Sequence, residues 1–199
     1  MSVILSHNIT LTDADHGITL HPLCDEHLPL LYRWNADPEV LYWSEGGSDP
    51  TLSYPPEVVH QIYGGISHQG NLCFAIETKG QLIGECWLQK MNLPEVRVLY
   101  AEGTDVRRID MCIGEKAFWG KGIGSLAMGM LVNFAFTREN VEVLHCINDD
   151  YNLRSRRMME KNGFALIRSI PLPQPHFGQF ELHWQLKREE YFATKKDRP

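Results

Sequence analysis

A glycine-rich segment between an expected strand and an expected helix most constrains the fold of this chain. It reads Trp119-Gly120-Lys121-Gly122-Ile123-Gly124-Ser125. Closely spaced glycines let the backbone approach a bulky anion. The N-terminus of the following helix adds free N–H groups and roughly half a positive charge. The segment therefore favours a pyrophosphate cradle, and the alternative is a tight turn that needs glycine only for its backbone conformation.

The spacing of these glycines separates the segment from two common nucleotide-binding fingerprints. The kinase-type loop G-x-x-x-x-G-K-[ST] needs a Lys-Ser or Lys-Thr pair after its glycines, and no such pair follows here. The Rossmann fingerprint G-x-G-x-x-G is matched only at its start, by Gly120-Lys121-Gly122. The pattern indicates a phosphate-binding turn of another kind.

A long amphipathic helix follows the turn. Its apolar residues recur at i, i+3, i+4, i+7, i+8 and i+11, the spacing of one helical face: Ile123, Leu126, Ala127, Met130, Leu131 and Phe134. Alternating or apolar runs predict strands at residues 18–23, 72–77, 81–88, 108–113, 141–147, 164–170 and 180–186. Further helices are expected near residues 25–34, 38–43, 55–63 and 152–161. These elements together predict a mixed α/β fold.

The length of the chain fits one domain over residues 1–199. Residues 1–17 are polar and turn-rich, and they predict either a loose N-terminal arm or a hairpin. Residues 188–199 form a charged tail that we expect to be helical at its start. Nothing in the pattern decides between a monomer and a homodimer.

The composition excludes several classes of function. A formal net charge of −6 argues against nucleic acid as a partner, and it suits a cationic ligand only weakly. No apolar run approaches the roughly 18 residues of a membrane span, and the N-terminus lacks the features of a signal peptide. We therefore expect a cytoplasmic protein with no membrane partner.

The cysteines and histidines do not form a metal motif. The five cysteines include no C-x-x-C pair and lie mostly in apolar runs, which indicates buried, reduced thiols. The nine histidines show no metal-ligand spacing such as H-E-x-x-H. We therefore expect no metal.

The order of motifs around the glycine-rich turn resembles that of the GNAT acetyltransferases. The first signature of that family is [QR]-x-x-G-x-[GA], and the second ends in Y-E-K-x-G-F. Here a strand, the turn, a helix and a strand precede Met159-Glu160-Lys161-Asn162-Gly163-Phe164 in the same order. The resemblance covers about residues 18–191. It implies a mostly antiparallel sheet with two splayed parallel central strands flanked by helices, and acetyl-CoA as co-substrate.

A narrower resemblance links the chain to the aminoglycoside 6′-N-acetyltransferases. It rests on Ile109-Asp110-Met111-Cys112-Ile113-Gly114-Glu115 before the turn, on Tyr42-Trp43 before a glycine-rich loop with Pro50-Thr51, and on the stretch 180–191. Siderophore-related acyltransferases share parts of this pattern.

The family resemblance implies how the chain holds acetyl-CoA. Backbone amides of the turn would bind the pyrophosphate: Trp119, Gly120, Lys121, Gly122, Ile123, Gly124 and Ser125. Pantetheine would lie between residues 109–113 and 143–147. Amides near Met111 or Cys112, on the strand that continues to Ile113, would face the thioester carbonyl and stabilise its oxyanion. Asn152 would contact the cofactor. Arg154 is a candidate for a CoA phosphate, and its alternative is a solvated arginine.

Two residues depart from the family signatures. Trp119 stands where the first signature has Gln or Arg, which matters little because backbone N–H groups do the binding. Met159 stands where the second signature has the tyrosine that protonates the leaving thiolate. If an acid is needed, Tyr151 or a water must serve. A thiolate whose conjugate thiol has a pKa of about 8.5 can also leave unassisted.

The acceptor side must handle an ammonium ion. Aliphatic amines have pKa values of roughly 8 to 10, so most are protonated and unreactive at neutral pH. Asp110 matches an aspartate of the aminoglycoside enzymes and is assigned to amine orientation and proton acceptance. Its alternative is an aspartate that is satisfied by a backbone or arginine partner. Further candidates for the acceptor site are Trp43, Glu45, Glu95, Glu102 and Asp105, with a core tryptophan and solvated surface acids as the alternatives.

These observations predict transfer of an acetyl group from acetyl-CoA to a primary amine of a small polycationic molecule. The 6′-amine of an aminoglycoside, a reaction of the antibiotic-resistance type, is the leading acceptor. A siderophore hydroxylamine, a polyamine or a protein amine are alternatives on the same fold. A non-catalytic CoA-binding regulator is the alternative from another class.

Overall fold

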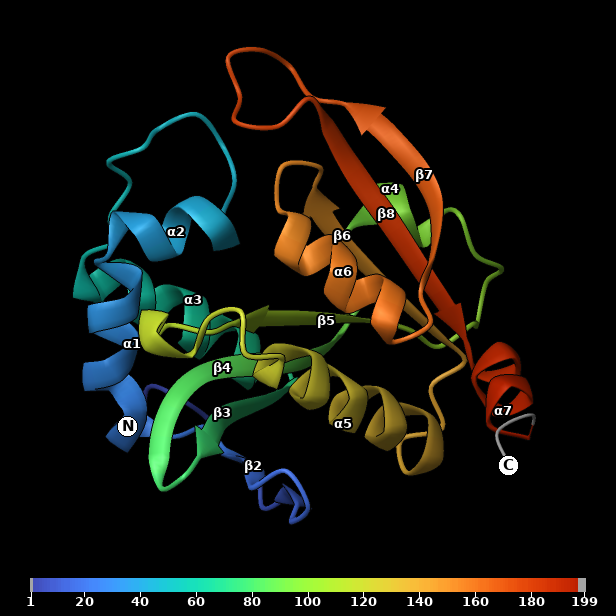
Figure 1. The fold of residues 1–199 in the computed structure, drawn as a ribbon, viewed down its shortest axis with the longest axis horizontal. Helices are drawn as coiled ribbons and strands as arrows, with labels where there is room; N and C mark the ends of the chain where they lie inside the picture. Colours follow the sequence, from blue (N-terminus) through green and yellow to red (C-terminus); the bar gives the residue numbers. More distant parts are fainter. Residues whose placement is uncertain (1, 197–199) are drawn as a thin grey trace.

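The computed structural model describes residues 2–196, which form one eight-stranded sheet with helices on its faces (Figure 1). The strands are β1 (Leu11–Asp13), β2 (Ile18–Pro22), β3 (Leu72–Thr78), β4 (Gln81–Lys90), β5 (Val106–Cys112), β6 (Val143–Asp149), β7 (Ala165–Pro171) and β8 (Phe180–Lys187). The helices are α1 (Leu28–Asn35), α2 (Pro38–Ser44), α3 (Pro56–His68), α4 (Pro94–Arg97), α5 (Ile123–Thr137), α6 (Leu153–Lys161) and α7 (Arg188–Lys196). Short 3₁₀ turns, η1 (Asp25–His27) and η2 (Lys116–Phe118), precede α1 and the glycine-rich turn.

The sheet is antiparallel except at its centre. Its strand order is β1-β2-β3-β4-β5-β6-β8-β7, and only β5 and β6 run parallel. This parallel pair is joined at two positions, Val106 with Val143 and Arg107 with Leu144, after which the strands diverge. Figure 1 shows β6, β8 and β7 turning away together from the direction of β5. The divergence confirms the splayed central pair that the family resemblance predicts.

The pleat of β5 sends its side chains to two different environments. Ile109 and Met111 pack in the cluster that α5 covers, together with residues such as Leu131 and Phe134. Cys112, whose side chain leaves the opposite face, packs against the cluster beneath α1 and α3. Because side chains alternate along a strand, Asp110 shares the face of Cys112. The sheet therefore separates an α5 face from a face covered by α1 and α3.

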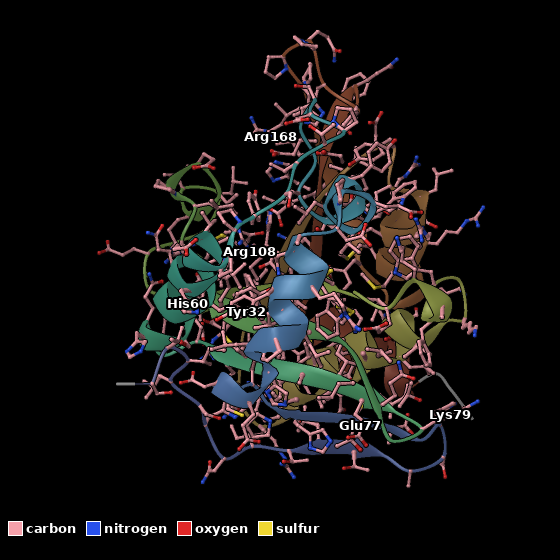
Figure 2. All side chains as sticks on the ribbon, turned by 90° about the vertical axis from the view of Figure 1, so that its left-hand side faces the viewer. Tyr32, His60, Glu77, Lys79, Arg108 and Arg168 are labelled. Atoms are coloured by element: carbon pink, nitrogen blue, oxygen red, sulfur yellow. The ribbon has the colours of Figure 1, made fainter. Side chains whose placement is uncertain are left out.

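The helices on the second face are tied to each other and to the N-terminal segment. Tyr32 of α1 hydrogen-bonds His60 of α3, and the two side chains lie between these helices (Figure 2). The Asp25 carboxylate accepts from the backbone amides of Val3 and Ile4 at 3.0 and 2.8 Å, and Ile4 is buried. Of the two alternatives for the N-terminal segment, residues 11–22 form the hairpin, with Leu11 paired to Leu20.

The predicted elements recur with small changes in their ends. Between the strands predicted at 81–88 and 108–113, the chain also forms the single-turn helix α4. The charged tail is helical as far as Lys196, and residues 197–199 lie outside the described part. Within residues 2–196 no helix is long and apolar enough to cross a membrane.

Candidate active site

The glycine-rich turn adopts a conformation that only glycine accepts easily. Gly120 and Gly122 have φ values of 72° and 81°, in the left-handed region. A Cβ atom at either position would meet nothing within 4 Å, so open space lies in front of both. The Trp119 indole anchors the turn by donating to the carbonyl oxygen of Ile113 at 2.6 Å. The turn is therefore fixed in shape and open on its outer side.

The backbone donors of this turn are available to a ligand. Helix α5 begins at Ile123, and Gly122 is its N-terminal cap without a side chain to satisfy the first amides. Among residues 2–196, none accepts a hydrogen bond from the amides of residues 121–124. Unsatisfied amides at a helix N-terminus bind anions, and phosphate fits them well.

A cavity of about 630 Å³ continues from the turn along α5 and α6. Its lining includes Gly122, Ser125, Lys161 and Asn162. The Asn162 amide also donates to the Ser125 carbonyl at 3.1 Å, which ties the two helices together. Free amides at the start of α5 and the Lys161 side chain in the same lining, which also includes Asp13, fit a phosphorylated cofactor such as CoA.

The gap between the diverging strands starts beside the turn. A Cβ atom at Gly124 would contact Met111, Ile113 and Met158, each at 3.7 Å, so the start of α5 lies against the end of β5. Beyond Arg107, no residue of β5 pairs with β6. The Cys112 thiol faces away from α5, so that only its backbone is placed for the predicted cofactor contact.

The guanidinium of Arg154 is held between two indole rings. It lies 4.2 Å from the ring centre of Trp43 and 4.4 Å from that of Trp119. Cation–π contacts of this kind are favourable at about 0.5–2 kcal/mol each. Arg154 of α6 thus joins α2 to the glycine-rich turn, because the rings of both tryptophans pack against its guanidinium.

Tyr151 and Asn152 fasten α2 to the start of α6. The Tyr151 hydroxyl donates to the Tyr42 carbonyl, and its ring packs against those of Trp43 and Phe177. Burial raises the pKa of Tyr151 above the ordinary value for a phenol. The Asn152 side chain caps α6 by accepting from Ser155 N at 3.1 Å and donates to the Trp43 carbonyl at 2.7 Å.

Asp110 is held by two neighbours on the sheet. Arg108 Nε donates to Asp110 Oδ2 at 2.7 Å, and the Gln89 amide donates to the same oxygen. The Asp110 side chain remains 36% exposed, so it can meet a ligand from solvent. Arg108 is therefore the arginine partner expected if Asp110 has a structural role. The exposed part of the carboxylate remains open for a second cation.

Two further carboxyl groups lie near Asp110. Glu45 reaches the surface, but the protein atoms around it partly desolvate its carboxyl and so raise its pKa; the neighbouring Asp110 raises it further, and a 3.4 Å hydrogen bond from Tyr54 opposes the shift. Glu85 of β4 is 4% exposed, and its electrostatic neighbours include Asp110 and Glu45. We call Glu45, Glu85 and Asp110 the acidic cluster.

The structure does not bring the other predicted acids to this cluster. Glu95 and Glu102 are exposed, on α4 and on the loop after it. Asp105 lies at the opposite end of β5 from Asp110, about 17 Å along the strand at ~3.3 Å per residue. Its carboxylate pairs with Arg107 at 3.1 Å, next to a second pair between Arg107 and Glu139.

Glu85 was not among the predicted site residues. Its signal in the sequence is a lone acid in the apolar run Leu82-Ile83-Gly84-Glu85-Cys86-Trp87-Leu88. The strand register gives that signal its meaning, because β4 pairs Glu85 with Cys112 and Trp87 with Asp110. Among residues 2–196, no group of three or more His, Cys, Asp or Glu side chains could hold a metal ion.

A cofactor bound by the turn and extended between β5 and β6 would bring its acyl end close to the acidic cluster. This is the geometry of a CoA-dependent acyltransferase. The chain belongs to the acetyltransferase (GNAT) domain family, whose match spans residues 18–165. It is therefore an acetyl-CoA-dependent N-acetyltransferase.

Curated relatives and solved structures agree with this assignment. The chain is 26% identical over 188 residues to an aminoglycoside N(6′)-acetyltransferase type 1 from Serratia marcescens, with 92% of each chain covered. A second such enzyme, from Klebsiella pneumoniae, is 26% identical over 167 residues, covering 82% of this chain and 81% of the relative.

Similar folds occur in enzymes with different acceptors. The structure of AAC(6′)-Ib with ribostamycin and coenzyme A has a TM-score of 0.72 at 21% identity, covering 92% of this chain and 99% of that one. A spermidine N-acetyltransferase from Vibrio cholerae, with CoA and spermine, has a TM-score of 0.71 at 16% identity, covering 88% and 98%. At these identities the likeness concerns the fold.

Proposed function

We propose that this enzyme acetylates a primary amine of a small polycationic molecule, and that the 6′-amine of an aminoglycoside is its acceptor. The observation that carries the proposal is the acidic cluster beside the point where β5 leaves β6. Three carboxyl groups gather there around a single ion-paired arginine, Arg108. The exposed Asp110 carboxylate and Glu45 beside it give this opening negative charge, which attracts cations.

The residues divide into two sets of tasks. The amides of the glycine-rich turn bind the pyrophosphate of acetyl-CoA, and the β5 backbone near Met111 and Cys112 faces the thioester. Asp110 binds the acceptor ammonium with its exposed side, while Arg108 and Gln89 keep the carboxylate in place. Glu45, at the end of α2, adds negative charge to the same opening.

The acyl transfer needs the ammonium to lose one proton before attack and a second as the amide forms. The amine loses a proton, and its lone pair attacks the thioester carbon. The carbon–sulfur bond breaks, and the sulfur leaves as a thiolate that accepts a proton from solvent. The second proton on nitrogen passes to water as the amide forms. Placing both reactants in one site supplies part of the rate, because it converts a bimolecular encounter into a local one.

The aminoglycoside assignment is supported by the curated relatives, and it is tested by comparing acceptors. We expect acetylation of kanamycin and tobramycin, which carry a free 6′-amine, with an apparent affinity that falls as ionic strength rises. Electrostatic steering in a charged cleft is worth roughly 10- to 10³-fold in encounter rate and is screened by salt. A 6′-hydroxyl analogue should bind without turnover, because it lacks the nucleophile.

Other results of this comparison would point elsewhere. If the free-amine and 6′-hydroxyl compounds behave alike, the proposal that the 6′-nitrogen is acetylated is wrong. Turnover of spermidine alone would favour a polyamine acceptor, whose charge the acidic cluster suits equally. Turnover of hydroxylamines alone would favour a siderophore acceptor. Binding of CoA with no turnover of any amine would favour a regulator.

A further inference from the structure

Glu85 is a buried acid directly across the strand from the expected reaction centre. It is 4% exposed, and its partner in the β4–β5 register is Cys112. Paired residues in antiparallel strands have Cα atoms about 4.5–5.5 Å apart. The backbone near Cys112 is expected to face the thioester on the β6 side of β5, so Glu85 lies across this one strand from the expected reaction centre.

The Glu85 carboxyl is incompletely satisfied in the structure. The Tyr63 hydroxyl donates to Oε1 at a long 3.5 Å, and Tyr63 is itself held by the Asn35 amide at 3.1 Å. Oε2 is buried and makes no hydrogen bond of normal geometry among residues 2–196, and the same holds for the Trp87 indole nitrogen, which lies near enough to Glu85 to act on its pKa. Leaving such atoms unpaired costs about 1–3 kcal/mol each, so a site of this kind favours a polar or charged ligand.

The charges around Glu85 disfavour its ionised form. Burial is the main cause that raises the pKa of Glu85, and Asp110 and Glu45 raise it further, while Tyr63 and Trp87 oppose the shift. The thiols of Cys73, Cys86 and Cys112 also lie within its electrostatic reach. Arg108, which could offset these acids, is bound to Asp110. A cation that enters the cluster would reverse the balance in favour of the carboxylate.

We propose that Glu85 takes the proton from the acceptor amine, while Asp110, paired with Arg108, orients that amine. The transfer moves one proton from the ammonium nitrogen to a Glu85 carboxylate oxygen. It leaves a neutral amine whose lone pair attacks the thioester carbon. The proposal rests on the proposed function, since it assigns the deprotonation step of that reaction.

Acceptor binding must then be coupled to proton release. In the free protein, burial and two neighbouring acids raise the pKa of Glu85 and so favour its neutral form. An arriving ammonium favours the carboxylate, so the Glu85 proton leaves to the buffer before the ammonium proton takes its place. A base whose pKa is raised toward the working pH is efficient for this transfer.

The test compares Glu85→Gln, which keeps the shape, with Glu77→Gln as a control on β3. Glu77 pairs with His21 at 3.2 Å at the far end of the sheet, near Lys79 (Figure 2). We expect kcat of Glu85→Gln to fall by about 10²–10⁴-fold, the usual range for a lost general base. KM should change less, and the control should stay near wild type.

Two measurements separate this role from a structural one. In the wild type, kcat/KM should fall on the acidic side as Glu85 protonates. This fall in kcat/KM at acidic pH should be absent in Glu85→Gln and should persist in Asp110→Asn. Calorimetry of acceptor binding to the CoA complex, in buffers of different ionisation enthalpy, should show about one proton more released by the wild type than by Glu85→Gln.

The stability of the variant provides its folding control. A pKa raised by folding contributes stability that is complete below the ordinary glutamate pKa and is lost as pH rises through the folded value. The wild type should therefore lose Tm relative to Glu85→Gln as pH increases. A folded but inactive Glu85→Gln variant supports the proposal. The Glu85→Asp variant, which keeps a carboxyl group, should retain more of the rate than Glu85→Gln.

Several outcomes would overturn the proposal. Unchanged kcat in Glu85→Gln over pH 6–9, equal proton release in both proteins, or a fall in kcat/KM at acidic pH that is absent only in Asp110→Asn would each do so. These outcomes differ from failure of the proposed function, which appears in the wild type as absence of turnover with every amine. If the wild type uses spermidine instead of an aminoglycoside, the same comparisons are made with spermidine.

Discussion

Replacing Gly122 with aspartate should abolish acetyl-CoA binding without unfolding the protein. Gly122 has a φ of 81°, and the space beyond it is open because the turn is built to receive an anion. An aspartate puts a side chain and a negative charge where the pyrophosphate should lie, and it opposes the field of the α5 N-terminus. The measurement is calorimetric titration of acetyl-CoA into the folded variant.

Gly103→Asp is a matched control for the backbone effect. Gly103 has a φ of 86°, faces equally open space and lies on the loop before β5. Both variants place a non-glycine residue in the left-handed region, which costs about 1–2 kcal/mol. Gly103→Asp should lose that stability and keep its cofactor affinity. Near-normal affinity in Gly122→Asp would remove the turn from the cofactor site.

The second large effect is expected for Asp110→Asn. The change keeps the shape of the side chain and removes the charge that faces the acceptor. It also leaves Arg108, now 2.7 Å from a neutral group, as an uncompensated cation beside the incoming ammonium. We expect turnover to fall by at least about tenfold, because the acceptor amine loses the charge that orients it for attack. Affinity for CoA should change little, because the Asp110 side chain leaves the face of β5 opposite to the one that α5 covers.

Asp105→Asn controls for the loss of an aspartate on the same strand. It too removes half of an ion pair, with Arg107, but at the end of β5 where the strands are still joined. Its turnover should stay close to that of the wild type. Unaltered turnover of Asp110→Asn across pH 6–9 would exclude Asp110 from the reaction.

Sequence patterns predicted the elements near the cofactor well, because their signals are local. The period of the apolar residues from Ile123 to Phe134 and the glycines before them lie on one continuous segment. The observed α5 starts at Ile123, directly after the left-handed Gly122. Asn152 and Gly163 likewise mark the two ends of α6, by capping and by a positive φ of 84°.

The pairing of β5 with β6 could not be derived from local patterns. Periodicity identifies strands without identifying their neighbours, so the splayed parallel pair was expected only from the family resemblance. Glu85 was missed for the same reason. An acid in an apolar strand gains its meaning from the register that pairs it with Cys112.

Contacts between distant segments were the other limit. The stack of Trp43, Arg154 and Trp119 and the hydrogen bond from Asn152 to Trp43 join segments far apart in the chain. Tyr151 was predicted as a possible acid, and the structure places its hydroxyl on the Tyr42 carbonyl. The sequence carries no local pattern for such contacts, which depend on how α2 docks on α6.

The central claim is acetyl transfer to an amine, and product analysis of the wild-type reaction tests it most directly. Acetyl-CoA should be incubated with kanamycin, a 6′-hydroxyl analogue, spermidine and a hydroxylamine. CoA release should then be compared with the acetylated product found by mass spectrometry and located by NMR. We predict stoichiometric release of CoA with kanamycin and a single acetyl group on its 6′-nitrogen. Acetyl-CoA that binds but yields no acetylated amine with any acceptor would contradict the account.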